Sequence, residues 1–260
     1  MTSVTVITGA SSGIGACLAH EAARAERKLV LVARSAEGLA KVADAIAAQS
    51  QARPETIALD LSETGAADRL ATELARRGLS VFELVNNAGY GLTGPVDAHS
   101  RADEVCIVDL NARALTDLTL RFLPEIIAAK GGVLNVASVA AFQPGPFNAI
   151  YYASKSYVLS FSEAIAYELR GRVRVTALCP GPVPTNFQRR ANPGKEPRRS
   201  QLRGMSAEKC AAIGWRGFEA GKRVVIPGFM NKVIAFLSPR MPRRPVLAIS
   251  AYLAMSRRAT

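Results

Sequence analysis

The chain has 260 residues, of which 49% are apolar, and this is enough to bury a large core and too apolar for a disordered protein. It contains no run of about 20 apolar residues that would span a membrane, and its start, MTSVTVITGA, is unlike a secretory leader, so we expect a cytoplasmic protein. The net charge of +12 is concentrated in residues 186–260, which hold 16 basic and 3 acidic side chains, and this is not the uniform basicity of a nucleic-acid-binding protein.

Short apolar runs alternate with helix-patterned segments along most of the chain. We expect strands at Val4–Thr8, Leu29–Ala33, Thr56–Leu59, Leu84–Asn86, Val133–Ala137, Val173–Leu178 and Val224–Ile226, and helices at Ile14–Arg27, Ala36–Ala48, Ala66–Arg77, Ala102–Ala129 and Tyr152–Arg170. The strands are uniformly apolar, which is typical of parallel strands covered on both faces. The sequence therefore predicts an α/β fold, a doubly wound Rossmann-type sheet of about seven parallel strands with helices on both faces.

No repeat or linker divides the chain, so we expect one domain over residues 1–260. Within it, residues 186–220 are predicted to be a substrate lid, because the polar, basic stretch 186–205 follows a strand and contains two Pro and two Gly. Residues 228–260 are predicted to be a basic amphipathic C-terminal extension. This extension could lie on an anionic membrane, roof the substrate pocket, contact a second subunit or remain solvated.

A glycine-rich turn joins the first predicted strand to the first predicted helix. Gly9, Gly13 and Gly15 permit tight turns and close backbone approach to a phosphate, and the N–H groups of the following helix suit a pyrophosphate. Ser11, Ser12 and Ile14 complete this turn. Its place at the first βα junction indicates a dinucleotide site, and the absence of a Walker lysine argues against NTP hydrolysis.

The end of the second strand predicts which dinucleotide binds. NAD-preferring sites place a carboxylate here to hold the adenosine ribose, whereas this chain has Ala33 followed by Arg34. An arginine can pair with the 2′-phosphate of NADP(H). We therefore expect NADP(H) as the cofactor, the alternative being that Arg34 is a solvated loop residue.

Tyr151 and Lys155 are four residues apart at the start of a predicted helix and so share one face. A nearby ammonium favours the phenolate, so Lys155 is expected to lower the pKa of Tyr151 from its usual ~10 towards neutrality. The phenol could then exchange a proton with a carbonyl or alcohol oxygen. Ser138 ends a preceding strand and could share that oxygen, while Tyr152 is a geometric rival to Tyr151.

These motifs together resemble those of the short-chain dehydrogenase/reductase family, in its standard type of about 250 residues. The matching residues are Thr8–Gly15, Asp60-Leu61, Asn86–Gly89, Asn111, Ser138, Tyr151-x-x-x-Lys155 and Pro180–Thr185. The overall run of the chain more loosely resembles the branch of 3-oxoacyl and hydroxysteroid reductases. The resemblance implies an oxidoreductase that acts on a carbonyl or alcohol.

The resemblance also implies a role for each matching residue. Tyr151 would be the general acid, Lys155 would lower its pKa and bind the nicotinamide ribose, Ser138 would polarise the substrate oxygen, and Asn111 would hold a water of the proton relay through a distorted helix. Asp60 would bind the adenine amino group with Leu61 beside it, and Asn87, Ala88 and Gly89 would line the adenosine ribose and the sheet. Pro180, Gly181, Val183 and Thr185 would cradle the nicotinamide.

We therefore expect an NADPH-dependent reductase of a hydrophobic or acyl-type ketone or aldehyde; the alternative is a catalytically silent NADP(H)-binding regulatory or scaffold protein, possibly membrane-peripheral. The basic lid residues could engage a phosphate-bearing acyl carrier; they are Arg189, Arg190, Lys195, Arg198, Arg199 and Arg203. A homodimer or homotetramer is expected through the long helices, and no nucleic acid. Four scattered cysteines and two histidines predict free thiols and no metal site.

Overall fold

A parallel β-sheet forms the centre of the computed structural model, which describes residues 1–49, 52–185 and 204–256. Its strands are β1 (Thr2–Thr8), β2 (Leu29–Ala33), β3 (Glu55–Ala58), β4 (Leu79–Asn86), β5 (Gly132–Val136), β6 (Arg174–Leu178) and β7 (Val224–Val225). Their order is β3-β2-β1-β4-β5-β6-β7. The predicted doubly wound sheet of seven parallel strands is confirmed, and its order reverses between β1 and β4, where such folds bind ligands.

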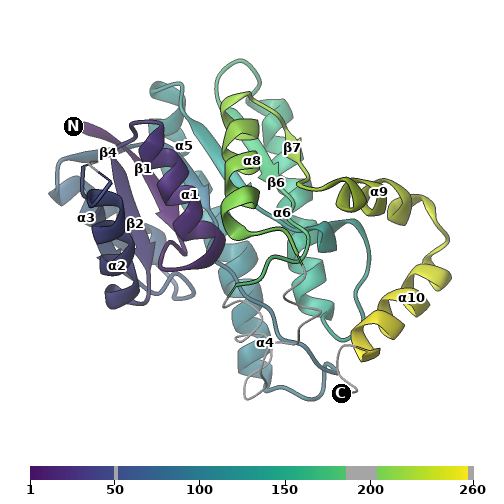
Figure 1. Cartoon of the computed structure of the whole chain (residues 1–260). Coiled ribbons are helices and arrows are strands. Elements are labelled where there is room, and N and C mark those ends of the chain that lie inside the picture. Colours follow the sequence, from purple (N-terminus) through teal and green to yellow (C-terminus); the bar gives the residue numbers. More distant parts are fainter. Residues whose placement is uncertain (50–51, 186–203, 257–260) are drawn as a thin grey trace.

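Helices cover both faces of the sheet (Figure 1). One face carries α1 (Gly13–Arg24), α2 (Ala36–Ala47) and α8 (Ala207–Glu219), and the other carries α3 (Ala66–Arg76), α5 (Leu115–Ala128) and α6 (Ala149–Glu168). Neighbouring strand residues serve opposite layers: Val6 packs in the cluster of Phe122, whereas Ile7 packs in the cluster of Phe218. Both faces of each central strand are therefore buried, which explains why the strands read as uniformly apolar.

The predicted helix 102–129 is interrupted by a wider turn. In the structure, α4 (Arg101–Val108), the π-helical segment η1 (Asp109–Ala114) and α5 follow one another directly and form one continuous helical segment. An i→i+5 hydrogen-bonding pattern adds a residue to a turn and displaces nearby backbone groups, and such turns concentrate at functional sites. Asn111 lies within this segment, so the predicted helix distortion at this residue is present.

The C-terminal part of the predicted lid is a core helix. Residues 186–203, including the basic residues from Arg189 to Arg203, lie outside the described residues. Helix α8, however, buries Ala211, Trp215 and Phe218 in the layer that contains α1. The lid prediction is therefore wrong for Ala207–Glu219, because these residues recur every three to four positions and so form one apolar face. The lid assignment of residues 186–206 stays a prediction.

Two further helices follow β7. They are α9 (Phe229–Leu237) and α10 (Arg243–Ser256), joined by the short 3-10 segment η3 (Ser238–Arg240). The described helices include none that is long and apolar enough to cross a membrane. In Figure 1, α10 stands away from the sheet and its covering helices.

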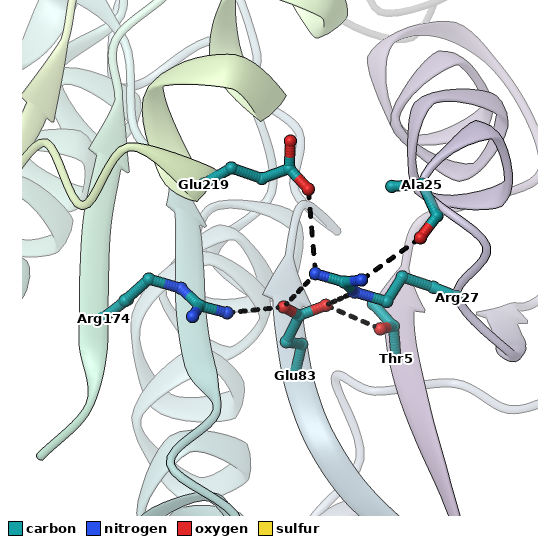
Figure 2. A network of polar contacts seen from close by, with 6 residues as sticks. All are labelled: Thr5, Ala25, Arg27, Glu83, Arg174 and Glu219. Carbon is teal, nitrogen blue, oxygen red and sulfur yellow. Dashed lines mark hydrogen bonds and ion pairs between the residues drawn. The ribbon is translucent and has the colours of Figure 1, made fainter.

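A buried carboxylate joins several strands of the sheet (Figure 2). Glu83 of β4 has no exposed surface. Its Oε2 accepts hydrogen bonds from Thr5 Oγ1 at 2.8 Å and Arg27 Nε at 3.1 Å, and its Oε1 accepts one from an Arg174 NH2 group at 2.8 Å. Arg27 also lies 3.7 Å from the Glu219 carboxylate. This network connects β1, β4, β6 and α8 on the half of the sheet away from the strands' carboxyl ends.

Candidate active site

Tyr151 and Lys155 lie one turn apart near the start of α6, which follows Asn148. The Lys155 side chain is buried and its Nζ donates a hydrogen bond to the carbonyl oxygen of Val136, the last residue of β5, at 2.8 Å. The same Nζ lies 5.9 Å from the centroid of the Tyr151 ring. The predicted pair therefore shares one helix face, and that face meets the carboxyl end of β5.

Ser138 lies two residues after the end of β5, in extended backbone that caps the 3-10 turn η2 (Val139–Phe142). Its Oγ accepts a hydrogen bond from the Ala140 N–H at 3.1 Å, and its hydroxyl is near enough to the Tyr151 phenol to act to lower the pKa of that phenol. The ring of Tyr151 lies against the α-carbon of Gly91, where an added Cβ would be 2.8 Å from it. Ser138, Tyr151 and Lys155 thus come together as the sequence predicts.

Tyr152, the geometric rival, points elsewhere. Its ring lies against Gly145, where an added Cβ would stand 2.3 Å from the ring. The rings of Tyr151 and Tyr152 are 6.1 Å apart and nearly perpendicular. The residue beside Ser138 and Lys155 is therefore Tyr151.

Burial dominates the proton affinities of the pair. It raises the pKa of Tyr151 to about 12, even though the Ser138 hydrogen bond acts to lower it, and it lowers the pKa of Lys155 to about 8. Burial therefore outweighs the predicted lowering of the Tyr151 pKa in the chain by itself, and the Lys155 ammonium donates to the Val136 carbonyl. At neutral pH the phenol is protonated, which is the form that donates a proton.

Asn111 positions the backbone beside this pair. Its Nδ2 donates to the Tyr90 carbonyl at 2.8 Å and to Ser154 Oγ at 3.0 Å, and its Oδ1 accepts from the Tyr90 N–H at 3.1 Å. A Cβ added at Gly89 would stand 2.8 Å from Asn111 Oδ1 and 3.5 Å from Lys155 Nζ. The side chain of Asn111 is committed to this loop, so the water that the family resemblance implies would be held by its backbone in η1, which stays a prediction.

The glycine-rich turn lies at the carboxyl end of β1 and presents the start of α1. Gly9 and Gly13 have positive φ angles of 64° and 60°, which favour glycine. A Cβ at Gly9 or Gly15 would clash with the Asn87 amide, at 2.8 and 2.3 Å. Within the described chain, Ser12 makes no side-chain capping bond to the first turn of α1, and that turn holds no acidic residue. Its N–H groups therefore suit an anion.

Asn87 and Ala88 fix the end of β4 to this turn. The Asn87 amide donates to the carbonyl oxygens of Thr8 at 3.0 Å and Gly9 at 3.1 Å. The backbone N–H groups of Asn87 and Ala88 both donate to Thr8 Oγ1 at 3.0 Å. These hydrogen bonds therefore hold the glycine-rich turn against the end of β4.

The segment after β6 reaches the same turn. The methyl carbon of Thr185 would lie 3.2 Å from a Cβ at Gly13, and Val183 is buried in a cluster against which Ile14 packs. Pro180 accepts hydrogen bonds at its carbonyl from the Val139 N–H at 2.9 Å and Ser138 Oγ at 3.4 Å. Residues 180–185 thus connect the Ser138 end of the site with the start of α1.

Arg34 and Asp60 lie together beyond β2 and β3. The Arg34 guanidinium, 63% exposed, is 3.6 Å from Asp60 Oδ2, while Asp60 Oδ1 accepts bonds from Ser62 N and Oγ at 2.9 and 2.6 Å. Burial acts to raise the pKa of Asp60, but the Ser62 and Arg34 contacts outweigh it and lower that pKa. Leu61 is buried in the core. Ser11 lies against Gly38, 2.9 Å from a Cβ added there.

Two parts of this region are absent from the sequence prediction. Asn231 of α9 lies over Gly181, with its Nδ2 2.4 Å from a Cβ added there. A buried polar row also crosses the sheet behind the site: Asn86 Nδ2 donates to Thr119 Oγ1 and Asn135 Oδ1 at 3.0 Å, and Asn135 Nδ2 donates to Ser162 Oγ at 2.9 Å. Asn86 stands in the matching Asn-Asn-Ala-Gly stretch, but its partners are distant in sequence.

A pocket of about 230 Å³ lies beside the start of α6. It begins one residue beyond Gly91, which contacts Tyr151. Its lining is mostly apolar and includes one carboxylate; the residues are Leu92, Gly94, Pro95, Val96, Glu104, Phe147, Asn148, Ala149 and Ile150. The pocket suits an apolar group held beside the start of α6. Among the described residues, no three His, Cys, Asp or Glu side chains gather as a metal site would require.

Comparison with known proteins gives the same family as the motifs. The short chain dehydrogenase family model matches residues 3–196. Sulfoacetaldehyde reductase of Chromohalobacter salexigens is 36% identical over 191 residues, which cover 72% of this chain and 75% of that protein. The very-long-chain 3-oxoacyl-CoA reductase of Bos taurus is 30% identical over 194 residues, covering 72% and 62%.

Solved structures show the same relationship. A short-chain dehydrogenase/reductase from Burkholderia phymatum in complex with NAD superposes with a TM-score of 0.79 at 28% identity, covering 91% of this chain and 92% of that one. A short-chain dehydrogenase from Sphingobium yanoikuyae in complex with NADPH also gives 0.79, at 29% identity and 92% and 94% coverage. The chain belongs to the short-chain dehydrogenase/reductase family of oxidoreductases.

Proposed function

We propose that this protein is an NADPH-dependent carbonyl reductase in which Tyr151 supplies the proton. The observation that carries the proposal is the convergence of Ser138, Tyr151 and Lys155 at the carboxyl end of β5. The protonated Tyr151 phenol and the neighbouring Ser138 hydroxyl can both donate hydrogen bonds to one carbonyl oxygen. Reduction builds negative charge on that oxygen, so both donors stabilise the transition state.

The residues of the chain divide the work of proton transfer. Ser138 and Tyr151 would bind and polarise the substrate oxygen, and the Tyr151 phenol would transfer its proton to it. Lys155 would stabilise the resulting phenolate by its charge, and Asn111 would hold the Tyr90 loop and η1 in place beside it. When bound, a nicotinamide dinucleotide supplies the hydride that reduces the carbonyl carbon.

The glycine-rich turn fits the pyrophosphate of such a cofactor. The uncapped start of α1 offers N–H groups, and side chains in place of Gly9 or Gly15 would collide with Asn87. Ser11, Ser12 and Ile14 belong to the same turn, and Thr185 and Val183 reach it from β6. Asp60, Ala88 and Gly89 would border the adenosine and nicotinamide ends on the two sides of this turn.

Arg34 supports NADP(H) over NAD(H) as the preferred cofactor. The exposed guanidinium of Arg34 follows the end of β2 and lies 3.6 Å from Asp60. NAD-preferring sites have an acidic residue at the end of β2, and such a residue would repel a 2′-phosphate. We expect Arg34→Asp to lower kcat/KM for NADPH by about 10²-fold, since a charge-assisted hydrogen bond contributes roughly 1.5–3 kcal/mol, and to change kcat/KM for NADH far less. Steady-state kinetics with both cofactors measures this.

Lys41→Asp is the matched control for Arg34→Asp, because Lys41 is an exposed base on α2 that pairs with Glu37. It should leave the ratio of the two kcat/KM values unchanged. Native protein that uses NADH and NADPH equally well would contradict the assignment of Arg34 to the 2′-phosphate.

The substrate is proposed to be a ketone or aldehyde that carries a hydrophobic or acyl group. The apolar pocket beside Tyr151 supports this proposal, and relatives named as 3-oxoacyl-CoA reductase and ketoacyl reductase act on such carbonyl compounds. The test is NADPH oxidation with a panel of 3-oxoacyl thioesters, bulky ketones and short polar aldehydes. Turnover that increases with the length of the apolar chain of the substrate supports the proposal. If no compound of the panel causes NADPH oxidation, a cofactor-binding regulatory or scaffold protein is favoured.

We also propose that two copies pair through α4, α5 and α6. These helices expose apolar side chains on the surface of the described chain, namely Val105, Val108, Leu120, Tyr157 and Tyr167. A two-fold axis through this face would bury them. The cytoplasmic location and the assignment of residues 1–260 to one domain stay predictions.

A further inference from the structure

The last two helices carry a concentrated apolar surface. We call it the C-terminal face and define it by the exposed apolar side chains Phe229, Met230, Ile234, Phe236, Leu237, Met241, Leu247, Ile249, Tyr252, Leu253 and Met255. Two of them, Phe229 and Tyr252, are 80% and 68% exposed. Exposed apolar residues are ordinary when scattered, but this many on two consecutive helices and their connection make a candidate binding surface.

These helices make few contacts with the rest of the chain. Asn231 of α9 donates through Nδ2 to the Pro227 carbonyl at 2.6 Å, and Ser238 Oγ, at the start of η3, donates to Gln143 Oε1 at 2.8 Å. In α10, the buried side chains are Val246 and Ser250. A helix packed on a globular core buries its apolar side and exposes its polar side. Among the side chains that the structure describes, helices α9 and α10 bury only Ala235, Val246 and Ser250, so most of their apolar side chains are left exposed.

The charges on this face have one sign. Between Phe229 and Met255 the charged residues are Lys232, Arg240, Arg243 and Arg244, all exposed and all basic. The Arg240 guanidinium stacks on the Phe236 ring at 3.9 Å from its centroid, so cation and aromatic group are presented together. A basic rim around an apolar centre is complementary to anionic headgroups above acyl chains.

A second copy of the chain fits this face poorly. Two-fold pairing would bring the same surface of each copy together, so four bases would meet four bases with no carboxylate between Phe229 and Met255 to neutralise them. We propose that the C-terminal face docks onto the surface of an anionic lipid bilayer. The two short helices would lie in the headgroup layer rather than cross it.

Docking would bring the active site to the membrane. Ser238 bonds to Gln143, which ends the turn that starts at Ser138, and Asn231 lies on Gly181. The face therefore borders the carboxyl edge of the sheet, where the candidate site lies. A carbonyl compound dissolved in the bilayer would then reach the pocket from the lipid.

Vesicle binding tests the proposal with the full-length protein. We expect it to sediment with vesicles of phosphatidylcholine and phosphatidylglycerol but not with pure phosphatidylcholine, and to be released by salt. The triple variant Arg240→Gln, Arg243→Gln, Arg244→Gln should bind the anionic vesicles about 10²-fold more weakly, since each base near such a surface contributes roughly 1 kcal/mol. A double variant, Phe229→Ser with Phe236→Ser, should also lose binding, because it removes apolar area.

The matched control is Lys28→Gln, Lys130→Gln, Arg172→Gln. These exposed bases precede β2, β5 and β6 at the opposite edge of the sheet, so the charge change is the same while the C-terminal face is intact. It should bind like the native protein, and all variants should retain NADPH binding. The proposal would be overturned if the protein bound neutral and anionic vesicles equally, or if the control variant lost as much vesicle binding as the triple variant. It would also be overturned if the variants changed only the oligomeric state.

Discussion

Replacing Tyr151 by Phe is expected to reduce carbonyl reduction by roughly 10²–10⁴-fold, the range that a positioned general acid contributes. The phenol is protonated and interacts with the Ser138 hydroxyl, and the Lys155 ammonium lies 5.9 Å from its ring centroid. Removing one oxygen leaves the ring in place against Gly91, so NADPH affinity should remain near the native value. Steady-state turnover and fluorescence titration with NADPH measure the two quantities separately.

Tyr152→Phe serves as the control for this substitution. Its ring packs against Gly145 instead of Ser138 and Lys155, so turnover should stay within about threefold of native. If Tyr151→Phe retains native turnover, another group donates the proton. If both variants are as inactive as the native protein on every substrate, the silent-scaffold alternative gains support.

Replacing Glu83 by Gln is expected to lower the free energy of unfolding by about 3 kcal/mol, the lower end of the range for breaking a buried ion pair. Glu83 is fully buried, and the variant leaves the guanidinium groups of Arg27 and Arg174 without their carboxylate. Both arginines keep some exposure, which moderates the loss. Urea unfolding followed by circular dichroism measures the change.

Asp68→Asn is the matched control, since Asp68 forms an exposed ion pair with Arg121 that water screens. It should unfold close to the native midpoint. If Glu83→Gln does not fold, Thr5→Val removes only the 2.8 Å bond to Glu83 and should cost about 1.5–3 kcal/mol. A Glu83→Gln midpoint equal to that of Asp68→Asn would contradict the structural role of the network.

The elements with strong local patterns were predictable from the sequence. Strand β2 has the predicted bounds, Leu29–Ala33, because a short, wholly apolar run between two helices identifies a buried parallel strand. The glycine turn and the Tyr151–Lys155 pair were also recognisable, since both depend on spacing within a few residues. Local chemistry specifies these features before the fold is assembled.

Features that depend on distant partners were not predictable. The first half of β4 was missed because Ser80 and Glu83 make it look polar, and the partners that neutralise Glu83 lie 56 and 91 positions away. Helix α8 was assigned to a lid because a basic, Pro- and Gly-containing stretch precedes it. Asn231 gave no signal, since its contact with Gly181 arises only when α9 folds back over the strand ends.

The most direct measurement is a crystal structure of the protein with NADPH and an unreactive alcohol analogue of its best substrate. The proposed mechanism predicts that the alcohol oxygen accepts or donates hydrogen bonds of about 2.6–3.2 Å with both Tyr151 Oη and Ser138 Oγ, with the carbinol carbon facing the nicotinamide. A complex in which that oxygen is held by other groups, and the Tyr151 phenol contacts only solvent or protein, would contradict the mechanism.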